Sequence, residues 1–451
     1  MKKGMFFALA ASSLLFSACS SDDAVVSTEG QNEAVQQIVL HVASSGDGLT
    51  TRAGRPLYSS QALQTIQNVR VMIYNADTKA IVKDAKLNWK ESTTYKNHGR
   101  QLTLTYKGDE RLSEGNYKVM AVGYSDGSDY TYSLDVTSAA ALTGTYSDIT
   151  ATLKTGKKVA EEVFAGDADL KIDANKDITN LTSGEEDGLA VTLHRQVAGS
   201  FGYFCNIPAK VGDKTAKTLR LVVSGKNDKL TFNNFNSLFT AAGATGSTIK
   251  YCVNGSTSTG KALASDAKFN NNEAGYVLYS IDLDTWFPGG DHNNDGVLNA
   301  EDTNWTHSTT YVNTQVVKGS VFGSNFVIPF NYAEGKNTME LQLLDAENNI
   351  IKTWTVSIPE SDVNKVAANG ATDATASIFN VVRNHMYNLG VKTSNGTTTP
   401  PDPSNPDPKP DPDPDKPKPG TDQPEDLTKS QNLILKVNDN WEAIHKLVLG
   451  D

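Results

Sequence analysis

Residues 102–108 read LTLTYKG, and apolar and polar side chains alternate throughout this stretch. Because the side chains of a β-strand point alternately to the two faces of a sheet, the pattern predicts a strand with one buried face. Similar runs recur between turns rich in Gly, Asn, Asp and Ser, while helical periodicity is scarce. They are VRVMIYNA (69–76), YKVMAVGYS (117–125), LRLVVSG (219–225), YVLYSIDL (276–283), FVIPFNYA (326–333), MELQLLD (339–345) and IIKTWTVSIP (350–359). The sequence therefore predicts an all-β protein made of β-sandwiches with Greek-key connections.

The chain has 451 residues, which is enough for two domains of ordinary size. A polar, turn-rich stretch precedes residue 189, and a fresh strand pattern follows it. We therefore expect an N-terminal β-sandwich over residues 53–188 and a C-terminal one over residues 189–395.

The composition changes abruptly after the second predicted domain. Residues 396–430 are rich in Pro and Asp, and eleven of the sixteen prolines lie between residues 396 and 426. Such a segment favours an extended polyproline II conformation and behaves as a semi-rigid spacer. This linker separates residues 431–451 from the rest of the chain.

Charge and composition exclude some classes of protein. Hydrophobic residues make up 38% of the chain, which suits packed cores and argues against a multi-span membrane protein. The formal net charge is -11, and no basic run occurs. Because phosphate binding needs clustered Lys and Arg, no nucleic-acid partner is expected.

The N-terminus has the pattern of an export signal. Lys2 and Lys3 precede an apolar run over residues 5–16, and small residues lead to Cys19. The pattern predicts a lipoprotein signal peptide over residues 1–18, with Cys19 as the lipidated residue. An ordinary signal peptide with an incidental cysteine is the alternative. Cys205 and Cys252 are then either a disulfide of an oxidising compartment or two free thiols.

The first strand-like stretch after the signal peptide resembles the last strand-like stretch of the chain. Residues 36–43 read QQIVLHVA, and residues 431–438 read QNLILKVN. In this alignment Leu433, Leu435 and Val437 match Ile38, Leu40 and Val42, one after the other. The two strands could therefore fill the same groove. A tail strand that folds back on its own domain is the alternative.

The stretch GDGLTTRAGRPL (46–57) lies just after the first predicted strand and has the polar, glycine-containing texture of an exposed loop. Exposed loops of this kind are preferred sites of proteolysis. A trypsin-like enzyme could cleave after Arg52, which leaves Ala53 as the new N-terminus, or after Arg55. A plain surface loop is the alternative.

Residues 291–302, DHNNDGVLNAED, follow the spacing of an EF-hand calcium loop. Gly296 stands at the sharp turn, and Pro288 before the loop argues against a helix–loop–helix pair. The expected oxygen ligands are Asp291, Asn293, Asp295, Val297 (through its carbonyl), Asn299 and Asp302. We expect Ca²⁺ here, with a metal-free, hydrogen-bonded turn as the alternative.

Two short stretches match enzyme motifs in part, but the residues around them do not fit those motifs. GYSDG (123–127) matches a nucleophile motif but lacks the following helix, and GSTSTGKA (255–262) ends in Ala where a P-loop needs Ser or Thr. The histidines show no metal-ligand spacing. The sequence therefore predicts a protein that is not an enzyme.

In layout the whole chain resembles the fimbrillins, the stalk subunits of type V pili, and the minor (short) fimbrium stalk subunits in particular. The most specific parts are LHRQVAGSF (193–201), VVRNHMYNLGV (381–391) and the tail with Trp441. The resemblance implies two transthyretin-like sandwiches and an outer-membrane lipoprotein precursor carrying palmitate.

The resemblance also implies a mechanism of assembly. An arginine-specific protease removes residues 19–52, cutting the Arg52–Ala53 bond. The tail strand of a like subunit, with Leu433, Leu435, Val437 and Trp441, then fills the vacated groove. The result is an extracellular, adhesive fimbrium completed by anchor and tip proteins. A tip adhesin or a surface glycan-binding lipoprotein is the competing function.

Overall fold

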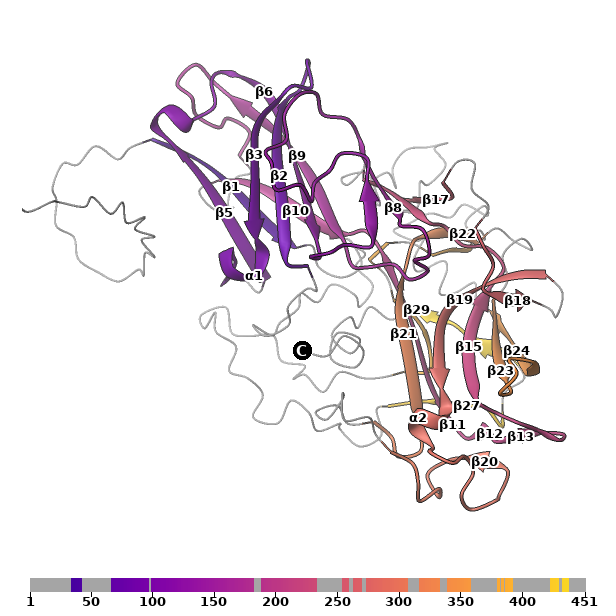
Figure 1. Cartoon of the computed structure of the whole chain (residues 1–451). Coiled ribbons are helices and arrows are strands. Elements are labelled where there is room, and N and C mark those ends of the chain that lie inside the picture. The colour runs from indigo at the N-terminus through magenta and orange to yellow at the C-terminus, as the bar shows by residue number, and fades with distance from the viewer. Residues whose placement is uncertain are drawn as a thin grey trace, which may run out of the picture.

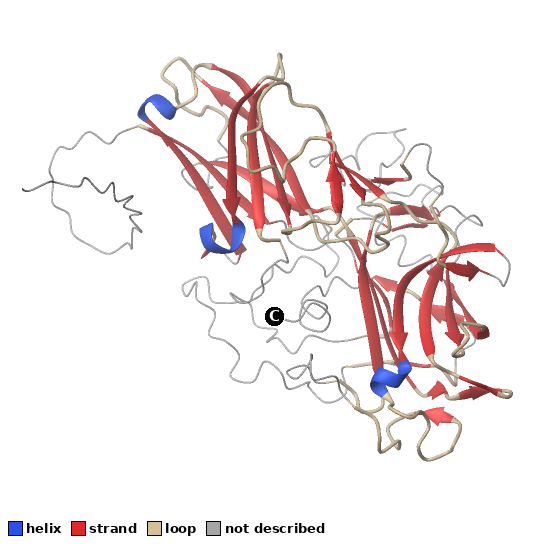
Figure 2. Ribbon diagram, viewed as in Figure 1, coloured by secondary structure: helices blue, strands red, loops and turns tan. Residues whose placement is uncertain are grey.

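The computed structural model describes residues 34–42, 66–96, 99–181, 188–232, 254–258, 263–269, 273–306, 316–332, 339–357, 379–381, 383–384, 386–391, 422–429 and 432–437. The regular secondary structure of these residues is almost entirely β-strand, which confirms the all-β class (Figure 2). Within these described ranges, helix is confined to α1 (Trp89–Ser92), α2 (Leu283–Trp286) and the 3-10 turn η1 (Gly108–Glu110). In the part of the chain that is described, no helix is long and apolar enough to cross a membrane.

The N-terminal half forms one eight-stranded sheet (Figure 1). Its strands lie in the order β3-β2-β6-β9-β10-β1-β5-β4, so the first strand of the chain lies inside the sheet. Their bounds are β1 (Val35–Val42), β2 (Asn68–Asn75), β3 (Ile81–Asn88), β4 (Thr94–Lys96), β5 (Gly99–Lys107), β6 (Gly115–Tyr124), β9 (Phe164–Ile172) and β10 (Leu189–Arg195).

Both faces of this sheet are covered along its centre. In β2, Val69, Val71 and Ile73 belong to one core cluster, whereas Met72 and Tyr74 belong to the other. The first cluster also holds Ile38 and Leu40 of β1 and lies within the N-terminal half. The second cluster extends into the C-terminal half.

A four-stranded sheet joins the two halves of the chain. Its order is β17-β16-β8-β7, and the antiparallel pair β8–β16 connects Ile149–Leu153 with Lys229–Phe232. The outer strands are β7 (Tyr130–Tyr132) and β17 (Gly255–Ser256).

Two larger sheets make up the C-terminal half. One has the order β18-β19-β15-β23-β24-β28, and the other has the path β21-β11-β26-β29 with β27 beside β11. The first contains β18 (Ala267–Phe269), β19 (Glu273–Asp282), β15 (Thr218–Val223), β23 (Met339–Leu344), β24 (Ile350–Ser357) and β28 (Asn432–Ile434). The second contains β21 (Val321–Val327), β11 (Ala198–Cys205), β26 (Met386–Leu389), β29 (Lys436–Val437) and β27 (Glu425–Asp426).

Short two-stranded pairs complete the C-terminal half. They are β12 (Ile207–Pro208) with β20 (Val297–Leu298), β13 (Lys210–Val211) with β14 (Lys214–Thr215), and β22 (Phe330–Tyr332) with β25 (Phe379–Val381). The Greek-key connections stay a prediction.

Strand pairing shows that the chain crosses from the N-terminal to the C-terminal half later than residue 188. The strand β10, which we expected to open the second domain, pairs with β9 and β1 of the first sheet. The next strand, β11, pairs with β21 and β26 of the C-terminal half. The passage therefore lies between Arg195 and Ala198, because β10 supplies the parallel partner of β1.

A buried polar junction marks this passage. The Arg195 guanidinium donates to Glu162 Oε1 at 2.6 Å and to Asn384 Oδ1 at 2.8 Å. The backbone N–H of Asn384 donates to the Val197 carbonyl at 2.9 Å. The stretches 193–201 and 381–391, which carried the resemblance, therefore lie side by side.

Candidate functional site

The first strand fills a groove with two hydrogen-bonding edges. Along β10, residues 38–42 of β1 pair in parallel with residues 189–193, and along β5, residues 35–41 pair antiparallel with residues 107–101. Without β1, both edges would present unpaired backbone N–H and C=O groups. We call the space that β1 occupies between β5 and β10 the strand groove.

One face of β1 is anchored in the core of the N-terminal half. Ile38 is 1% exposed and Leu40 is fully buried, and both lie in the core cluster with Leu102, Leu189 and Val191. Burying a side chain of this size contributes about 1.5–3 kcal/mol. The pockets beneath these two side chains therefore hold the strand in place.

A polar side chain completes this face. Gln36 is 1% exposed, its Oε1 accepts the Leu112 N–H at 2.7 Å, and its Nε2 donates to the Leu112 carbonyl at 3.0 Å. The same Nε2 donates to the Lys176 carbonyl at 2.8 Å. The buried amide of Gln36 is thus fully used, as buried polar groups require.

The tail lies on its own C-terminal half. The strand β28 pairs in parallel with Thr355–Ser357 of β24, and β29 pairs antiparallel with Tyr387–Asn388 of β26. This is the arrangement that we named as the alternative to a detached tail. The predicted alternation is nevertheless present, because Leu433 and Leu435 are each 1% exposed whereas Ile434 is 47% exposed.

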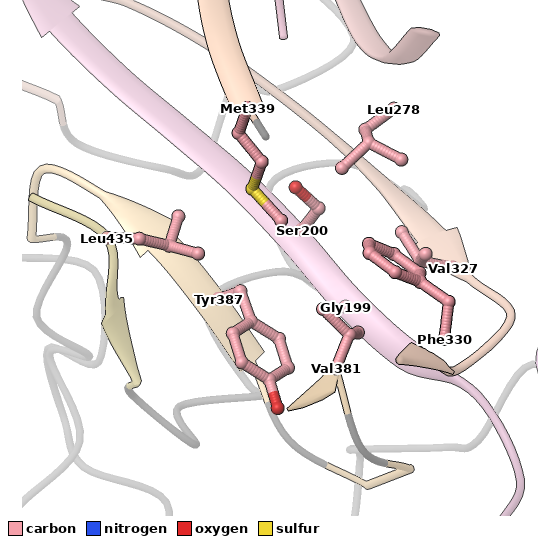
Figure 3. Close-up of a pocket in the computed structure, with 9 residues that line it drawn as sticks. All are labelled: Gly199, Ser200, Leu278, Val327, Phe330, Met339, Val381, Tyr387 and Leu435. Atoms are coloured by element: carbon pink, nitrogen blue, oxygen red, sulfur yellow. The ribbon is translucent and has the colours of Figure 1, made fainter. Parts of the chain in front are cut away.

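Leu435 closes a small apolar pocket between β11 and its neighbours (Figure 3). In the close-up, its side chain projects from the tail toward Tyr387 of β26 and the strand that carries Ser200. The other lining residues are Gly199, Leu278, Val327, Phe330, Met339 and Val381. The side chain predicted to enter a neighbouring subunit is therefore buried in its own.

The segment before the tail strand is anchored as well. The strand β27 pairs in parallel with Phe204 and Cys205 of β11, and Leu427 beside it is fully buried. Gln423 and Val391 exchange two backbone hydrogen bonds of 2.8 Å. The described residues that flank positions 392–421 are therefore hydrogen-bonded to each other on the C-terminal half.

Asp426 holds this anchor through several hydrogen bonds. Burial alone would raise the pKa of its carboxyl, but donors from Lys429, Thr428 and Asn206 hold that pKa well below its usual range. Asn206, which directly follows β11, donates its side-chain amide to Asp426 Oδ2 at 2.8 Å and so ties β27 to the end of β11.

The Cys205 thiol faces the same anchor. Its Sγ lies 3.9 Å from the Pro424 carbonyl, and burial raises the pKa of the thiol to about 11. A thiol with such a pKa carries little reactive thiolate at neutral pH. Cys205 has no disulfide partner among the described residues. Cys252 lies outside them, so the pairing of these two cysteines is still open.

The loop 291–302 is closed by Asp302, which is 1% exposed. Its Oδ1 accepts the N–H groups of His292 at 2.8 Å and Asn293 at 3.3 Å, and its Oδ2 accepts the Asn299 N–H at 2.9 Å. The closing residue therefore uses both oxygens to hold backbone amides.

Among the side-chain oxygens of the other expected ligands, only Asp291 Oδ1 lacks a hydrogen-bond donor, whereas those of Asn293, Asp295 and Asn299 accept hydrogen bonds within the loop. Asp291 Oδ2 accepts the Gly296 N–H at 2.8 Å, while its Oδ1 is buried with no hydrogen-bond partner in the structure. The Asn299 amide and the Val297 N–H hold the pKa of Asp295 below its usual range. Among the described residues, no group of three or more His, Cys, Asp or Glu side chains is placed to hold a metal ion. The calcium site therefore stays a prediction.

Several predicted residues lie outside the described part of the chain. These are the signal peptide with Cys19, the cleavage site at Arg52 and Ala53, and Trp441 in the tail. For Val437 the structure gives the backbone pairing only. Their predicted roles are carried forward as proposals.

Comparison with known proteins gives distant structural similarity alone. No protein-family model and no curated protein matches the chain. A fimbrial assembly protein from Parabacteroides distasonis aligns with 80% of this chain and 92% of its own, at 11% identity and a TM-score of 0.31.

Two further solved structures come from Porphyromonas gingivalis. The tip fimbrial protein Mfa3 with a C-terminal truncation aligns with 79% of this chain and 94% of its own, at 9% identity and a TM-score of 0.33. The fimbrial anchor protein Mfa2 aligns with 79% and 90%, at 10% identity and a TM-score of 0.32. At these identities and TM-scores, the three solved structures give this chain a distant structural similarity and no functional role.

Proposed function

We propose that the protein is a structural subunit of a cell-surface fimbrium that assembles by protease-activated strand exchange. The precursor reaches the outer membrane as a lipoprotein modified at Cys19, with β1 in the strand groove. Cleavage of the Arg52–Ala53 bond by an arginine-specific protease frees β1, and the tail strand of a second copy replaces it. Because this head-to-tail contact does not close on itself, it builds an open extracellular filament.

One observation carries the proposal. The segment that fills an interior groove of the sheet, residues 36–42, is matched in sequence by residues 431–437 at the far end of the chain. Leu433 and Leu435 already alternate with an exposed Ile434, so they present the face that the pockets of Ile38 and Leu40 accept. Val437 takes the position of Val42.

Once β1 has left, the number of paired residues favours binding of the tail in the strand groove over its position on its own domain. On its own domain the described part of the tail, residues 432–437, pairs through three residues with β24 and two with β26. In the strand groove, β1 pairs through five residues with β10 and seven with β5. The groove therefore offers more backbone hydrogen bonds to the same segment.

The same features favour a stalk subunit over a tip adhesin or a surface glycan-binding lipoprotein. A tip subunit needs no donor strand, since nothing lies beyond it, and an anchor subunit needs to keep its lipid. This chain combines an arginine after the first strand with a donor-like tail. Fimbrial anchor and tip proteins are then its further partners, and its role is structural instead of enzymatic.

Brief trypsin treatment of the purified precursor tests the proposal. We expect SDS-resistant ladders whose subunits begin at Ala53. The variant with both Arg52→Ala and Arg55→Ala should stay monomeric under the same treatment, because β1 remains covalently attached.

A control separates exchange from general stickiness of the cut chain. The variant Lys436→Asp alters the face of the tail that side-chain alternation turns away from the pockets. It should form ladders at close to the wild-type rate. If the cleaved wild-type protein stays monomeric over a wide range of concentrations, the strand-exchange function is wrong.

A further inference from the structure

On the face of β1 that packs into the core, Gln36 is the polar residue, and its side chain makes several hydrogen bonds. The side-chain amide of Gln36 bonds the N–H and C=O of Leu112, which follows η1, and the C=O of Lys176 in a neighbouring turn. We call these three backbone groups the amide cradle. They receive the side chain of Gln36, which lies on the same face of β1 as Ile38 and Leu40.

The cradle needs an amide more than it needs a charge or an apolar group. The Leu112 N–H requires an acceptor, and the Leu112 C=O requires a donor, so a single carboxamide satisfies both. The Lys176 carbonyl also receives the Arg111 guanidinium and keeps that donor when Gln36 leaves. When β1 leaves, the backbone N–H and C=O of Leu112 therefore lose their hydrogen-bond partner, the Gln36 amide.

The apolar pattern of the tail specifies its register only in part. A shift by one residue would turn Leu433 and Leu435 to the wrong face, but a shift by two residues keeps them on the correct one. One such shift places Gln431 at the buried position of Ile38, which hydrophobic burial opposes. The other places Leu435 and Val437 at the positions of Ile38 and Leu40 and Asp439 at the half-buried position of Val42, which burial opposes less strongly. A polar group at a fixed distance from the leucines would resolve the ambiguity.

The tail carries that group at the required position. Gln431 stands two residues before Leu433, as Gln36 stands two residues before Ile38. In the matched register Gln431 meets the cradle. In the registers shifted by two residues, either Leu433 or Lys429 meets it instead, and the Leu112 N–H and C=O lose their complementary pair.

We propose that the amide cradle binds the side-chain carboxamide of Gln431 from a second copy of this chain and thereby sets the register of strand exchange. This inference rests on the proposed function and adds the residue that selects among registers. A buried backbone group left without its partner corresponds to about a 5- to 150-fold change in an equilibrium constant. The cradle thus adds to the discrimination between registers that the apolar face provides.

Cross-linking between tail and groove tests the register. Ile434 matches Val39, which lies opposite Thr103 of β5. In the two shifted registers Ile434 would lie opposite Thr105 or Gln101. Directly opposed residues of neighbouring strands have the Cα separation that a disulfide needs.

The experiment mixes two full-length chains in which the native cysteines are serine. One carries Ile434→Cys, and the other carries Thr103→Cys, Thr105→Cys or Gln101→Cys. After trypsin treatment and mild oxidation, we expect the unaltered tail to cross-link with the Thr103→Cys chain. With Gln431→Leu, cross-links should appear at the other two positions, and assembly should slow by about 5- to 150-fold.

Asn432→Leu is the matched control, because it removes a neighbouring amide from the opposite face of the same strand. It should cross-link as the unaltered tail does. If Gln431→Leu cross-links with Thr103→Cys alone and assembles at the wild-type rate, the cradle does not set the register, although strand exchange stands. If even the unaltered tail gives neither ladders nor cross-links, the proposed function falls, and this inference falls with it.

Discussion

Leu435→Ala should destabilise the C-terminal half of the unprocessed chain, and Ile434→Ala should leave it almost unchanged. Leu435 is 1% exposed and closes the pocket beside Tyr387, whereas the neighbouring Ile434 is 47% exposed. Truncating a buried Leu to Ala costs about 2–5 kcal/mol, depending on how far the site can collapse. The site borders an existing pocket and lies near the chain end, so we expect about 2–3 kcal/mol, near the lower limit.

Calorimetry of the two variants beside the wild type measures this difference. For a cooperative unit of 150–250 residues, 1 kcal/mol corresponds to a shift of about 2–4 °C in Tm. The Leu435→Ala transition of the C-terminal half should therefore fall by about 4–12 °C. The Ile434→Ala transition should move by less than about 2 °C, since a surface substitution usually changes stability by about 0.5 kcal/mol or less.

Equal shifts for the two variants would refute the packing of the tail on its own domain. Two shifts near zero would point to the detached tail that the proline-rich composition suggests. In that case a chain ending near residue 421 would keep its stability. The structure predicts the opposite for this truncation, because it removes Leu427, Leu433 and Leu435 from the core.

Three further predictions concern other parts of the chain. Calorimetric titration with Ca²⁺ should show one site in residues 291–302 that Asp291→Ala abolishes, and identical titrations of the two proteins would mean that the loop is only a turn. N-terminal sequencing of surface fibres should give Ala53, whereas a chain that begins at Cys19 would mean that the lipid is retained. The pKa of Asp426 is depressed in the folded protein, so its contribution to stability is complete above the ordinary carboxyl pKa of about 3.9 and is lost as the pH falls toward the folded value. Urea unfolding should therefore show that Asp426→Asn is destabilising at pH 7 and less so at pH 3, and a difference that is independent of pH would contradict this assignment.

Alternation of apolar and polar residues predicted the buried faces well but did not predict the partner of each strand. The run ending at Lys107 does form a strand, and in the tail the leucines are buried while Ile434 is exposed. A period of two specifies a face and nothing about which groove that face enters. For this reason the same segment, residues 432–437, fits both its own domain and the proposed strand groove.

The limits of the first sheet were harder to predict. The turn-rich stretch before residue 189 has the composition of a domain boundary, yet β10 joins the N-terminal sheet through its parallel pairing with β1. The two strands are about 150 residues apart in the sequence, and no local signal encodes such a pairing. The buried contacts of Arg195 with Glu162 and Asn384 were likewise invisible, because each partner comes from a different segment.

The roles of Gln36 and Asp302 show what local patterns can and cannot indicate. The spacing of residues 291–302 predicted a calcium loop, with a hydrogen-bonded turn as the alternative; the structure shows Asp302 accepting backbone N–H groups of this loop, and calcium binding stays a prediction. Gln36 carries no signal of burial, because glutamine is usually exposed. Its repetition as Gln431 was visible in the sequence, but its meaning required the hydrogen bonds to Leu112.

The anchor at β27 determines how closely two copies would dock during the proposed exchange. If Asp426 keeps its contact with Asn206 and Leu427 stays buried, the donated segment starts at Gln431, four residues after a fixed point on its own domain. Four extended residues span at most about 14 Å, so the neighbour's groove would have to lie close to the C-terminal half of the donor. If β27 also detaches, the proline-rich segment becomes a long spacer and the subunits separate. The contacts of β27 involve none of the side chains that the groove would accept, so nothing in the exchange itself requires the anchor to open. A closely packed filament with short inter-subunit connections is therefore the expected product of exchange between intact subunits.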